Sequence, residues 1–186
     1  LQLFEEILGN IVEDVKRASA IILSLRRMIK KDSKEKLRIG IDGIVNEVLL
    51  LFRGQASVKD IIVERENGTG EQYVFADSVL IQQVILNLLL NASEALEKKA
   101  GGSRKIILRT KVLDGFVNVS VLDNGPGIPA SIKKEIFNPF FTTKNNGMGI
   151  GLAICRSIIE DHEGTLQFED NESGGAVFTF KLRAVE

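Results

Sequence analysis

The sequence predicts an α+β fold: a two-layer α/β sandwich with a mixed, largely antiparallel sheet that helices cover on one face, preceded by a long N-terminal helix. Three observations predict it. Strand patterns come in pairs joined by short turn signals, helical patterns separate these pairs, and the first 31 residues contain a helical pattern and no strand pattern. A doubly wound parallel sheet would instead alternate single strands with helices.

The composition is that of a globular domain. The chain has 186 residues, of which 44% are hydrophobic and 26% charged, and this length fits one domain with a short appendage. No apolar run approaches the roughly 18 residues that span a bilayer, so we expect no transmembrane helix and no membrane contact by this part of the protein. The chain starts at Leu1, without a signal peptide, and looks like a piece of a longer protein.

Charge and residue usage exclude several kinds of site. The net charge of −1 argues against a strongly basic surface and therefore against nucleic acid as a partner. The single cysteine, Cys155, excludes an internal disulfide and a cysteine-based zinc site. The single histidine, His162, excludes a multi-histidine metal site and is interpreted as a structural residue near a helix C-terminus. The chemistry of this intracellular domain then has to come from Asn, Asp, Glu, Lys and backbone groups.

The first predicted element is a helix over residues 4–31. Its apolar side chains recur at alternating spacings of four and three, which indicates a narrow seam packed against other helices. Such a seam fits either an ordinary core helix or one half of a helical hairpin that dimerises. The stretch from Lys30 to Lys36 is charged and is interpreted as a linker, so we divide the chain into residues 1–36 and 37–186. The seam consists of Ile11, Val15, Ala18, Ile22, Leu25 and Ile29.

Mixed strand and helix patterns follow the linker. Alternation predicts strands, spacings of three and four predict helices, and glycine pairs predict the turns between them. Asp77 is the predicted N-cap of a long helix, which Gly101 and Gly102 end. The predicted elements up to this point are a strand at Leu37–Ile41, a helix at Ile44–Phe52, strands at Ile61–Glu66 and Tyr73–Ala76 around a turn at Gly68–Gly70, and a helix from Asp77 to about Lys98.

The second half of the chain alternates hairpins with helices. An Asp-Gly pair predicts the first hairpin turn, and a Ser-Gly-Gly sequence predicts the second. The predicted elements are strands at Ile106–Val112 and Phe116–Leu122, a short helix around Ile132–Phe137, an irregular segment to about Gly147, a helix at Ile150–Asp161, and strands at Leu166–Glu169 and Ala176–Leu182.

Two amides and a carboxylate share one face of the long helix. Asn87, Asn91 and Glu94 lie at positions i, i+4 and i+7. Amides on an otherwise apolar helix need polar partners, and a magnesium ion with its water shell, tied to phosphates, supplies such partners. Ordinary capping or backbone hydrogen bonding by the two asparagines is the structural alternative.

The sequence Asp123-Asn124-Gly125-Pro126-Gly127-Ile128 follows a predicted strand. A carboxylate at the end of a strand, set in an apolar pocket, can accept the exocyclic amino group of adenine, whereas guanine presents a carbonyl oxygen at that place. The glycines would let the backbone approach the base. The alternative is an ordinary turn.

The segment from Phe137 to Lys144 places three phenylalanines in a stretch that otherwise has a turn pattern. Apolar anchors in a loop favour a lid that docks on the body of the domain, with Lys144 as a point charge for a phosphate. A loop held to the core by aromatic residues, with a solvated lysine, is the alternative.

Gly147, Gly149 and Gly151 stand at alternate positions before a helix. Free N–H groups and a helix N-terminus favour an anion cradle, although the spacing matches neither a P-loop nor a dinucleotide-binding fingerprint. A flexible hinge would show the same pattern.

The order of these four clusters resembles the ATP-binding domain of sensor histidine kinases of two-component systems. This domain has the Bergerat fold of the superfamily that also contains gyrase, chaperone and mismatch-repair ATPases. The resemblance covers roughly residues 37–186. The residue sequences from Phe137 to Lys144 and from Gly147 to Leu152 are most similar to those of oxygen-sensing and aromatic-compound-sensing kinases.

The resemblance implies ATP and Mg²⁺ as cofactors and assigns residues to them. Asn91 would hold Mg²⁺, Asn87 would assist at the phosphates, and Asp123 would bind the adenine amino group. Thr179 would join Asp123 through a water. Glu94 stands where many relatives carry a basic residue, and either a base or a partner for a basic neighbour fits it. The implied catalytic residues are Asn87, Asn91 and Lys144, and the remaining nucleotide-binding residues are Gly125, Gly127, Ile128, Gly147, Met148, Gly149, Ile150, Gly151 and Leu152.

The resemblance also implies a function and partners. It implies a cytoplasmic protein-histidine kinase that transfers the γ-phosphate of ATP to a histidine, for relay to a response regulator, and that is a homodimer at full length. Residues 4–31 are similar to the second helix of the dimerisation and phosphotransfer hairpin, so the phosphoacceptor histidine would lie outside this chain and His162 would not be phosphorylated. A stand-alone ATPase or serine kinase of the superfamily, and a degenerate docking module, are the alternatives.

Overall fold

The computed structural model describes residues 36–66, 68, 71–99, 101–144 and 147–185. The predicted helix over residues 4–31 and nearly all of the predicted linker lie outside these residues and stay predictions. The elements are β1 (Leu37–Gly40), α2 (Ile41–Val58), β2 (Ile61–Glu66), β3 (Tyr73–Ala76), α3 (Ser78–Glu97), β4 (Arg104–Leu113), β5 (Phe116–Asp123), a 3₁₀ turn (Ala130–Ile132), α4 (Gly151–Asp161), β6 (Thr165–Asp170) and β7 (Ala176–Val185).

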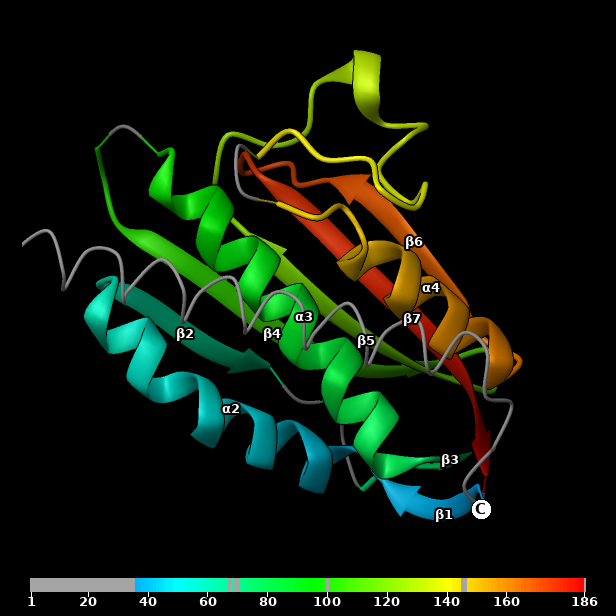
Figure 1. Ribbon diagram of the computed structural model, residues 1–186. Helices are drawn as coiled ribbons and strands as arrows, with labels where there is room; N and C mark the ends of the chain where they lie inside the picture. The colour runs from blue at the N-terminus through cyan, green and yellow to red at the C-terminus, as the bar shows by residue number, and fades with distance from the viewer. Residues whose placement is uncertain (1–35, 67, 69–70, 100, 145–146, 186) are drawn as a thin grey trace, which may run out of the picture. The chain divides into compact units, whose positions relative to one another are not determined.

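Within the described residues, seven strands form one sheet in the order β1-β3-β7-β5-β4-β2, with β6 also paired to β7. The helices α2, α3 and α4 lie together on one face of this sheet (Figure 1). Alternate residues of β4, β5 and β7 point into the layer between sheet and helices, where Leu108, Val119 and Phe180 are buried. The predicted two-layer α+β sandwich is confirmed.

The central helix α3 carries much of the core. Ile81, Val84, Ile85, Leu88 and Leu89 have no exposed surface because α2, α4 and the sheet surround them. Its length and apolar composition would suffice to cross a membrane, but this hydrophobicity is accounted for by burial inside the domain. Asp77 caps its start as predicted, with Oδ1 accepting hydrogen bonds from the backbone N–H of Val79 at 2.9 Å and of Leu80 at 3.3 Å.

Strand pairing differs from the prediction between residues 61 and 76. β2 and β3 have the predicted bounds, but they are not partners of one another. β2 runs parallel to β4 at one edge of the sheet, whereas β3 lies near the other edge, antiparallel to β1 and β7. The expectation that these two strands pair with each other around the turn at Gly68–Gly70 is therefore wrong, whereas the parallel pair fits the predicted mixed sheet. The partner of β2 is β4, a strand that follows α3. A turn signal between neighbouring segments does not reveal such a pairing.

The other two strand pairs form as predicted. β4 and β5 are an antiparallel hairpin whose turn residues, Asp114 and Gly115, have φ angles of 53° and 77°. Positive φ at both central positions is the conformation that two-residue hairpins favour. β6 and β7 pair from Thr165 opposite Lys181 to Asp170 opposite Ala176.

The predicted short helix around residues 132–137 is wrong. A 3₁₀ turn spans Ala130–Ile132 instead, and turns continue from it. Backbone N–H groups of Ile132, Glu135 and Asn138 each bond the carbonyl three residues earlier. Successive turns of this kind do not build the i to i+4 ladder of an α-helix.

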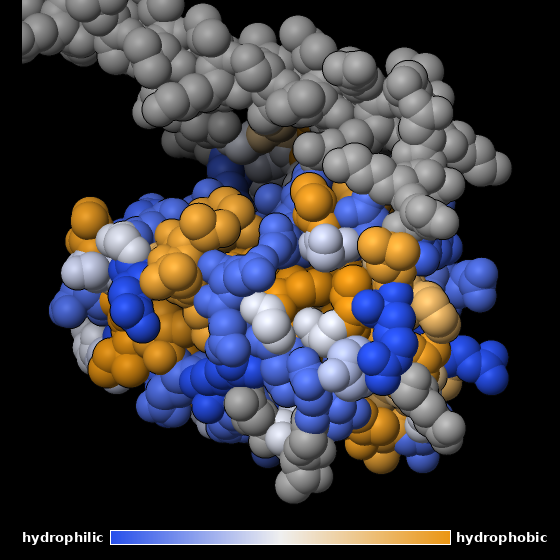
Figure 2. Space-filling view, turned by 90° about the horizontal axis from the view of Figure 1, so that it is seen from below, coloured by the Kyte–Doolittle hydropathy of each residue, from blue (hydrophilic) through white to orange (hydrophobic). Residues whose placement is uncertain are grey.

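Hydrophobic residues also occur on the outer surface of α2. Leu50, Leu51 and Val58 are 66%, 69% and 88% exposed. Figure 2 views the molecule from the side of α2 and β1 and shows hydrophobic groups set among hydrophilic ones there.

Candidate functional site

Asp123, the last residue of β5, lies in a largely buried position with 4% of its surface exposed. Its Oδ1 accepts hydrogen bonds from the backbone N–H of Gly125 at 2.8 Å and of Ala176 at 3.3 Å. Oδ2 has no hydrogen-bond partner in the part of the chain that the structure describes. Burial raises the pKa of this carboxyl group above its ordinary value, and the two N–H groups oppose that shift. The site thus presents one open acceptor at the end of a strand.

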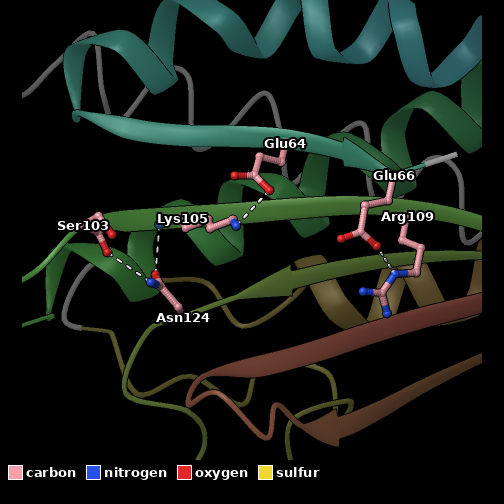
Figure 3. Close-up of polar contacts among 6 residues, drawn as sticks. All are labelled: Glu64, Glu66, Ser103, Lys105, Arg109 and Asn124. Atoms are coloured by element: carbon pink, nitrogen blue, oxygen red, sulfur yellow. Dashed lines mark hydrogen bonds and ion pairs between the residues drawn. The ribbon is translucent and has the colours of Figure 1, made fainter.

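Asn124 fixes the end of β5 to the beginning of β4. Its side-chain oxygen accepts the N–H of Lys105 at 2.9 Å, and its side-chain amide donates to the carbonyl of Ser103 at 3.0 Å (Figure 3). Its own N–H also bonds the carbonyl of Lys105. These bonds continue the ladder past the last paired residues and hold the chain on which Asp123 sits.

Two backbone segments approach Asp123 closely. A Cβ on Gly125 would lie 2.9 Å from Oδ1 of Asp123 and 3.5 Å from Ala95 of α3. Gly175, in the turn between β6 and β7, has a φ of 99°, and a Cβ there would lie 2.1 Å from the carbonyl oxygen of Asp123. Gly127 has a φ of 75° and would place a Cβ 3.3 Å from the carbonyl oxygen of Gly175. Glycine at these positions therefore lets the loop after β5 and the turn between β6 and β7 pack closely around the Asp123 carboxylate, next to α3.

The structure does not bring Thr179 to Asp123, and that expectation is wrong. Thr179 pairs with Ser120 across β5 and β7, and their hydroxyl oxygens are 2.8 Å apart. Asp123 is three residues beyond Ser120, so its side chain points to the opposite face of the sheet. The β7 residue beside Asp123 is Ala176, which supplies only its backbone N–H.

Lys144 joins two of the predicted polar residues of α3. Its Nζ donates to Oδ1 of Asn91 at 3.0 Å and forms an ion pair with the Glu94 carboxylate. The side chains of Lys144 and Glu94 are 39% and 42% exposed. The sequence placed Asn91 and Glu94 on one helix face, and the structure adds the lysine that lies between them from a segment about fifty residues later.

Asn87 faces a different neighbour, one turn earlier on α3. Its side chain hydrogen-bonds the thiol of Cys155 on α4, whose Sγ also lies 3.9 Å from the carbonyl oxygen of Val84. Burial raises the pKa of Cys155 to about 12, and the Asn87 hydrogen bond opposes this shift. The three residues predicted to share one helix face therefore have different neighbours. Asn91 and Glu94 contact Lys144, and Asn87 contacts α4.

The segment that carries Lys144 is anchored by two of its three phenylalanines. Phe137 meets Phe178 of β7 edge to face, with ring centroids 6.3 Å apart, and Phe141 packs against the core. Phe140 is 72% exposed, so the prediction that all three act as anchors is wrong for this residue. Figure 1 shows the described residues between β5 and α4 beyond the end of the sheet at which β5 finishes.

The predicted glycine run packs against this same segment. A Cβ on Gly147 would lie 2.4 Å from Oγ1 of Thr142, and one on Gly149 would lie 2.4 Å from the carbonyl oxygen of Phe141. Gly151, the first residue of α4, has no neighbour that would exclude a side chain. Of the residues between and around them, Ile150 is buried, and Met148, Leu152 and Ile128 are partly buried. Gly147 and Gly149 therefore let the chain fold back onto the Lys144 loop.

His162 is a structural residue at the end of α4, as predicted. Its Nε2 accepts the backbone N–H of Asp77 at 3.0 Å, and its Nδ1 therefore carries the proton and donates to the carbonyl of Ile158 at 2.7 Å. Both ring nitrogens are engaged, and 7% of the residue is exposed.

Sequence reasoning missed three residues that shape the surroundings of Asp123. Asn124 and Gly175 were interpreted only as turn residues, and Asn171, whose amide donates to the Asp123 carbonyl at 2.8 Å, was not singled out. The neighbouring Ser-Gly-Gly sequence signalled a turn, but only the strand register shows that this turn meets the end of β5.

Comparison with known proteins places this geometry in a family. A family model described as histidine kinase-, DNA gyrase B- and HSP90-like ATPase matches residues 76–186. The sensor protein FixL of Bradyrhizobium diazoefficiens is 36% identical over 184 residues, which are 98% of this chain and 36% of FixL. The signal transduction histidine-protein kinase AtoS of Escherichia coli is 32% identical over 96% of this chain and 29% of AtoS. The chain thus spans about a third of the length of these curated relatives.

Solved structures agree with this result. The catalytic domain of histidine kinase ThkA, in a nucleotide-free form, is 38% identical with a TM-score of 0.72, covering 81% of this chain and 96% of that one. ThkA in complex with the response regulator protein TrrA is 33% identical with a TM-score of 0.78, covering 94% of this chain and 49% of that one. The chain therefore belongs to the histidine kinase-, DNA gyrase B- and HSP90-like ATPase family, and it contains the ATP-binding catalytic domain of a sensor histidine kinase.

Proposed function

We propose that this domain binds Mg·ATP and donates the γ-phosphate to a histidine on a dimerisation helix outside this chain, for relay to an aspartate of a response regulator. The observation that carries the proposal is the environment of Asp123. A buried carboxylate with one oxygen held by backbone N–H groups and the other open is suited to accept an amino group of a flat ligand. Glycine at positions 125 and 175 lets backbone pack directly against this carboxylate and holds it at the end of β5.

Asp123 would distinguish adenine from guanine. The open Oδ2 is acceptor-only while the carboxyl group is ionised, so it pairs with the amino group of adenine and faces the carbonyl oxygen of guanine without a hydrogen bond. A buried polar mismatch of this kind rejects the wrong ligand strongly, because the site's own acceptor is left unpaired.

The phosphates would lie toward Asn91 and Lys144. Asn91 Oδ1 and the Glu94 carboxylate already hold a cation, the Lys144 ammonium, so the oxygen donors in this place fit Mg²⁺, which prefers such ligands. When bound, the metal would neutralise phosphate charge. Asn87 would assist at the phosphates by turning from Cys155, and the Gly147–Gly151 segment would support the Lys144 loop beside them.

Phosphoryl transfer depends on positioning and charge stabilisation more than on covalent chemistry by the protein. The acceptor is not His162, because both of its nitrogens are engaged in a buried position. The relatives named as sensor kinases, and ThkA solved with a response regulator protein, support transfer of the phosphate to a receiver domain. The proposal includes a cytoplasmic homodimer as the state of the full-length protein.

Calorimetric titration of the chain with Mg·ADP and with a non-hydrolysable ATP analogue tests the nucleotide site. We expect binding to the wild type, at least tenfold weaker binding to Asp123→Asn, and clearly weaker binding of guanine than of adenine nucleotides by the wild type. Asp114→Asn is the matched control, because it makes the same chemical change in an exposed hairpin turn where Asn tolerates the positive φ. Equal affinity of both variants would refute the assignment of Asp123.

Incubation with γ-labelled ATP tests the transfer. The full-length protein should acquire acid-labile label on a histidine N-terminal to this chain, whereas this chain alone should stay unlabelled. Label on His162 would contradict the proposal.

A further inference from the structure

One cationic side chain is bound by two oxygens where the proposed function expects a metal. Lys144 Nζ lies 3.0 Å from Oδ1 of Asn91 and forms an ion pair with Glu94, and both oxygen donors come from the same face of α3. An ammonium group and a divalent cation compete for these oxygens, and their like charges repel when both lie within contact distance of one oxygen. The two cations therefore disfavour one another at Asn91.

The loop presents Lys144 in a defined conformation. Its backbone N–H donates to Oγ1 of Thr142 at 3.1 Å, and its carbonyl accepts the N–H of Gly147 at 3.2 Å. Phe141 anchors the preceding residues in the core, and Gly149 leaves no space for a side chain behind them. The hydrogen bonds of this turn thus hold the Lys144 ammonium next to α3.

The contact of Lys144 with Glu94 is weak enough for a metal ion to replace the lysine. Both partners of the ion pair are more than a third exposed, and a pair of this kind contributes little to stability, because solvent competes for both charges. A divalent ion carried by a nucleotide can displace the ammonium at a cost of about fivefold in affinity or less. The displaced lysine remains beside the phosphates, where its charge is attractive.

We propose that Asn91 and Glu94 together form a divalent-cation site that Lys144 occupies in the nucleotide-free protein and leaves when the metal enters. This proposal rests on the proposed function and extends it by making Glu94 a second oxygen donor to the cation. The acidic residue thereby has two partners in turn: the lysine when the site is without nucleotide, and the metal when Mg·ATP is bound.

Binding of Mn²⁺ without nucleotide, followed by electron paramagnetic resonance of the free ion, tests the exchange. Lys144→Met should bind Mn²⁺ about two- to fivefold more tightly than the wild type, because the competing ammonium is gone. Glu94→Gln in the Lys144→Met background should lose this gain, and Glu94→Asp should keep part of it.

Two matched controls separate exchange from a general change of charge. Lys133→Met removes a half-exposed lysine that pairs with Asp170 on β6. Glu97→Gln removes a carboxylate one turn along α3, whose pKa is lowered mainly by a hydrogen bond from Lys59 and in smaller part by the charge of Lys144. Neither control should reproduce the effect of its counterpart.

The outcome is independent of the nucleotide test. Equal Mn²⁺ affinity of wild type and Lys144→Met, including no binding to either, overturns the exchange even if Mg·ADP binds normally. A gain that survives removal of Glu94 also overturns it. Conversely, a Glu94-dependent gain in a protein that binds no adenine nucleotide would keep the metal site and reject the proposed function.

Discussion

Replacement of Gly175 by alanine should disable the nucleotide site through the backbone of Asp123. The added Cβ would lie 2.1 Å from the carbonyl oxygen of Asp123 and 2.7 Å from its Oδ1. To restore a contact of 3.0 Å, one of the two segments has to move by about 0.9 Å. Such a shift changes the direction of the only side chain proposed to read the base.

The neighbouring Gly174 provides a control for the magnitude. Both glycines have positive φ angles, 87° and 99°, but a Cβ on Gly174 meets only one atom, at 3.9 Å. Backbone strain of about 1–3 kcal/mol applies to alanine at either position. Overpacking adds about 1–3 kcal/mol for Gly175 alone. We therefore expect Gly174→Ala to lose about 1–3 kcal/mol of unfolding free energy, and Gly175→Ala about 2–6 kcal/mol.

Urea denaturation and calorimetry with Mg·ADP measure the two effects. Gly174→Ala should bind nucleotide within about twofold of the wild type, and Gly175→Ala at least tenfold more weakly, which is about 1.4 kcal/mol or more. If both variants bind equally well and are equally stable, the turn between β6 and β7 does not form a wall of the site, and the reasoning from its close approach fails.

Three further predictions concern the same region. Burial raises the pKa of Asp123, so the folded state holds this proton more tightly than the unfolded state, and wild-type stability falls as the pH rises through the raised pKa. Asp123→Asn keeps an oxygen for both N–H groups, so in urea denaturation it should match or exceed the wild type at pH 7, and its advantage should diminish in acid. Asn124→Ala should lose about 1–2 kcal/mol and weaken Mg·ADP binding several-fold, whereas Asn118→Ala, which loses one exposed hydrogen bond, should change neither by much. Cys155, buried and with a pKa of about 12, should react with a thiol reagent at pH 8 only at the rate of unfolding, and rapid reaction of the native protein would show that this burial is wrong.

Local signals predicted much of the fold. Asp77 caps α3 through its own side chain, and Asp114 with Gly115 makes a turn within the hairpin, so the information lies in adjacent residues. Both strands around residue 70 have the predicted bounds for the same reason. Their partners were not predictable, because β2 pairs with a strand that lies beyond α3.

The candidate site follows the same division. Asp123 is recognisable because a strand ends in a carboxylate before glycines, and Asn91 with Glu94 because of helical spacing. The position of Thr179 depends on the register between β5 and β7, which places it opposite Ser120. Asp123 is three residues beyond Ser120, and an odd separation along a strand puts two side chains on opposite faces of the sheet. The meeting of Lys144 with α3, and of Gly175 with Asp123, joins segments about fifty residues apart through tertiary packing. No local pattern contains that information.

The parallel strand β2 is the terminal strand on its side of the described sheet. A terminal strand presents unpaired amide groups to which another molecule could add a strand. Along β2, Glu64 and Glu66 place carboxylates at alternate positions, where Lys105 and Arg109 of β4 neutralise them from within the same molecule (Figure 3). A second copy approaching edge to edge would have to remove these charged side chains from water, which costs free energy. The cross-strand ion pairs thereby discourage fibril-like growth of the sheet, and acid or concentrated salt would weaken this protection.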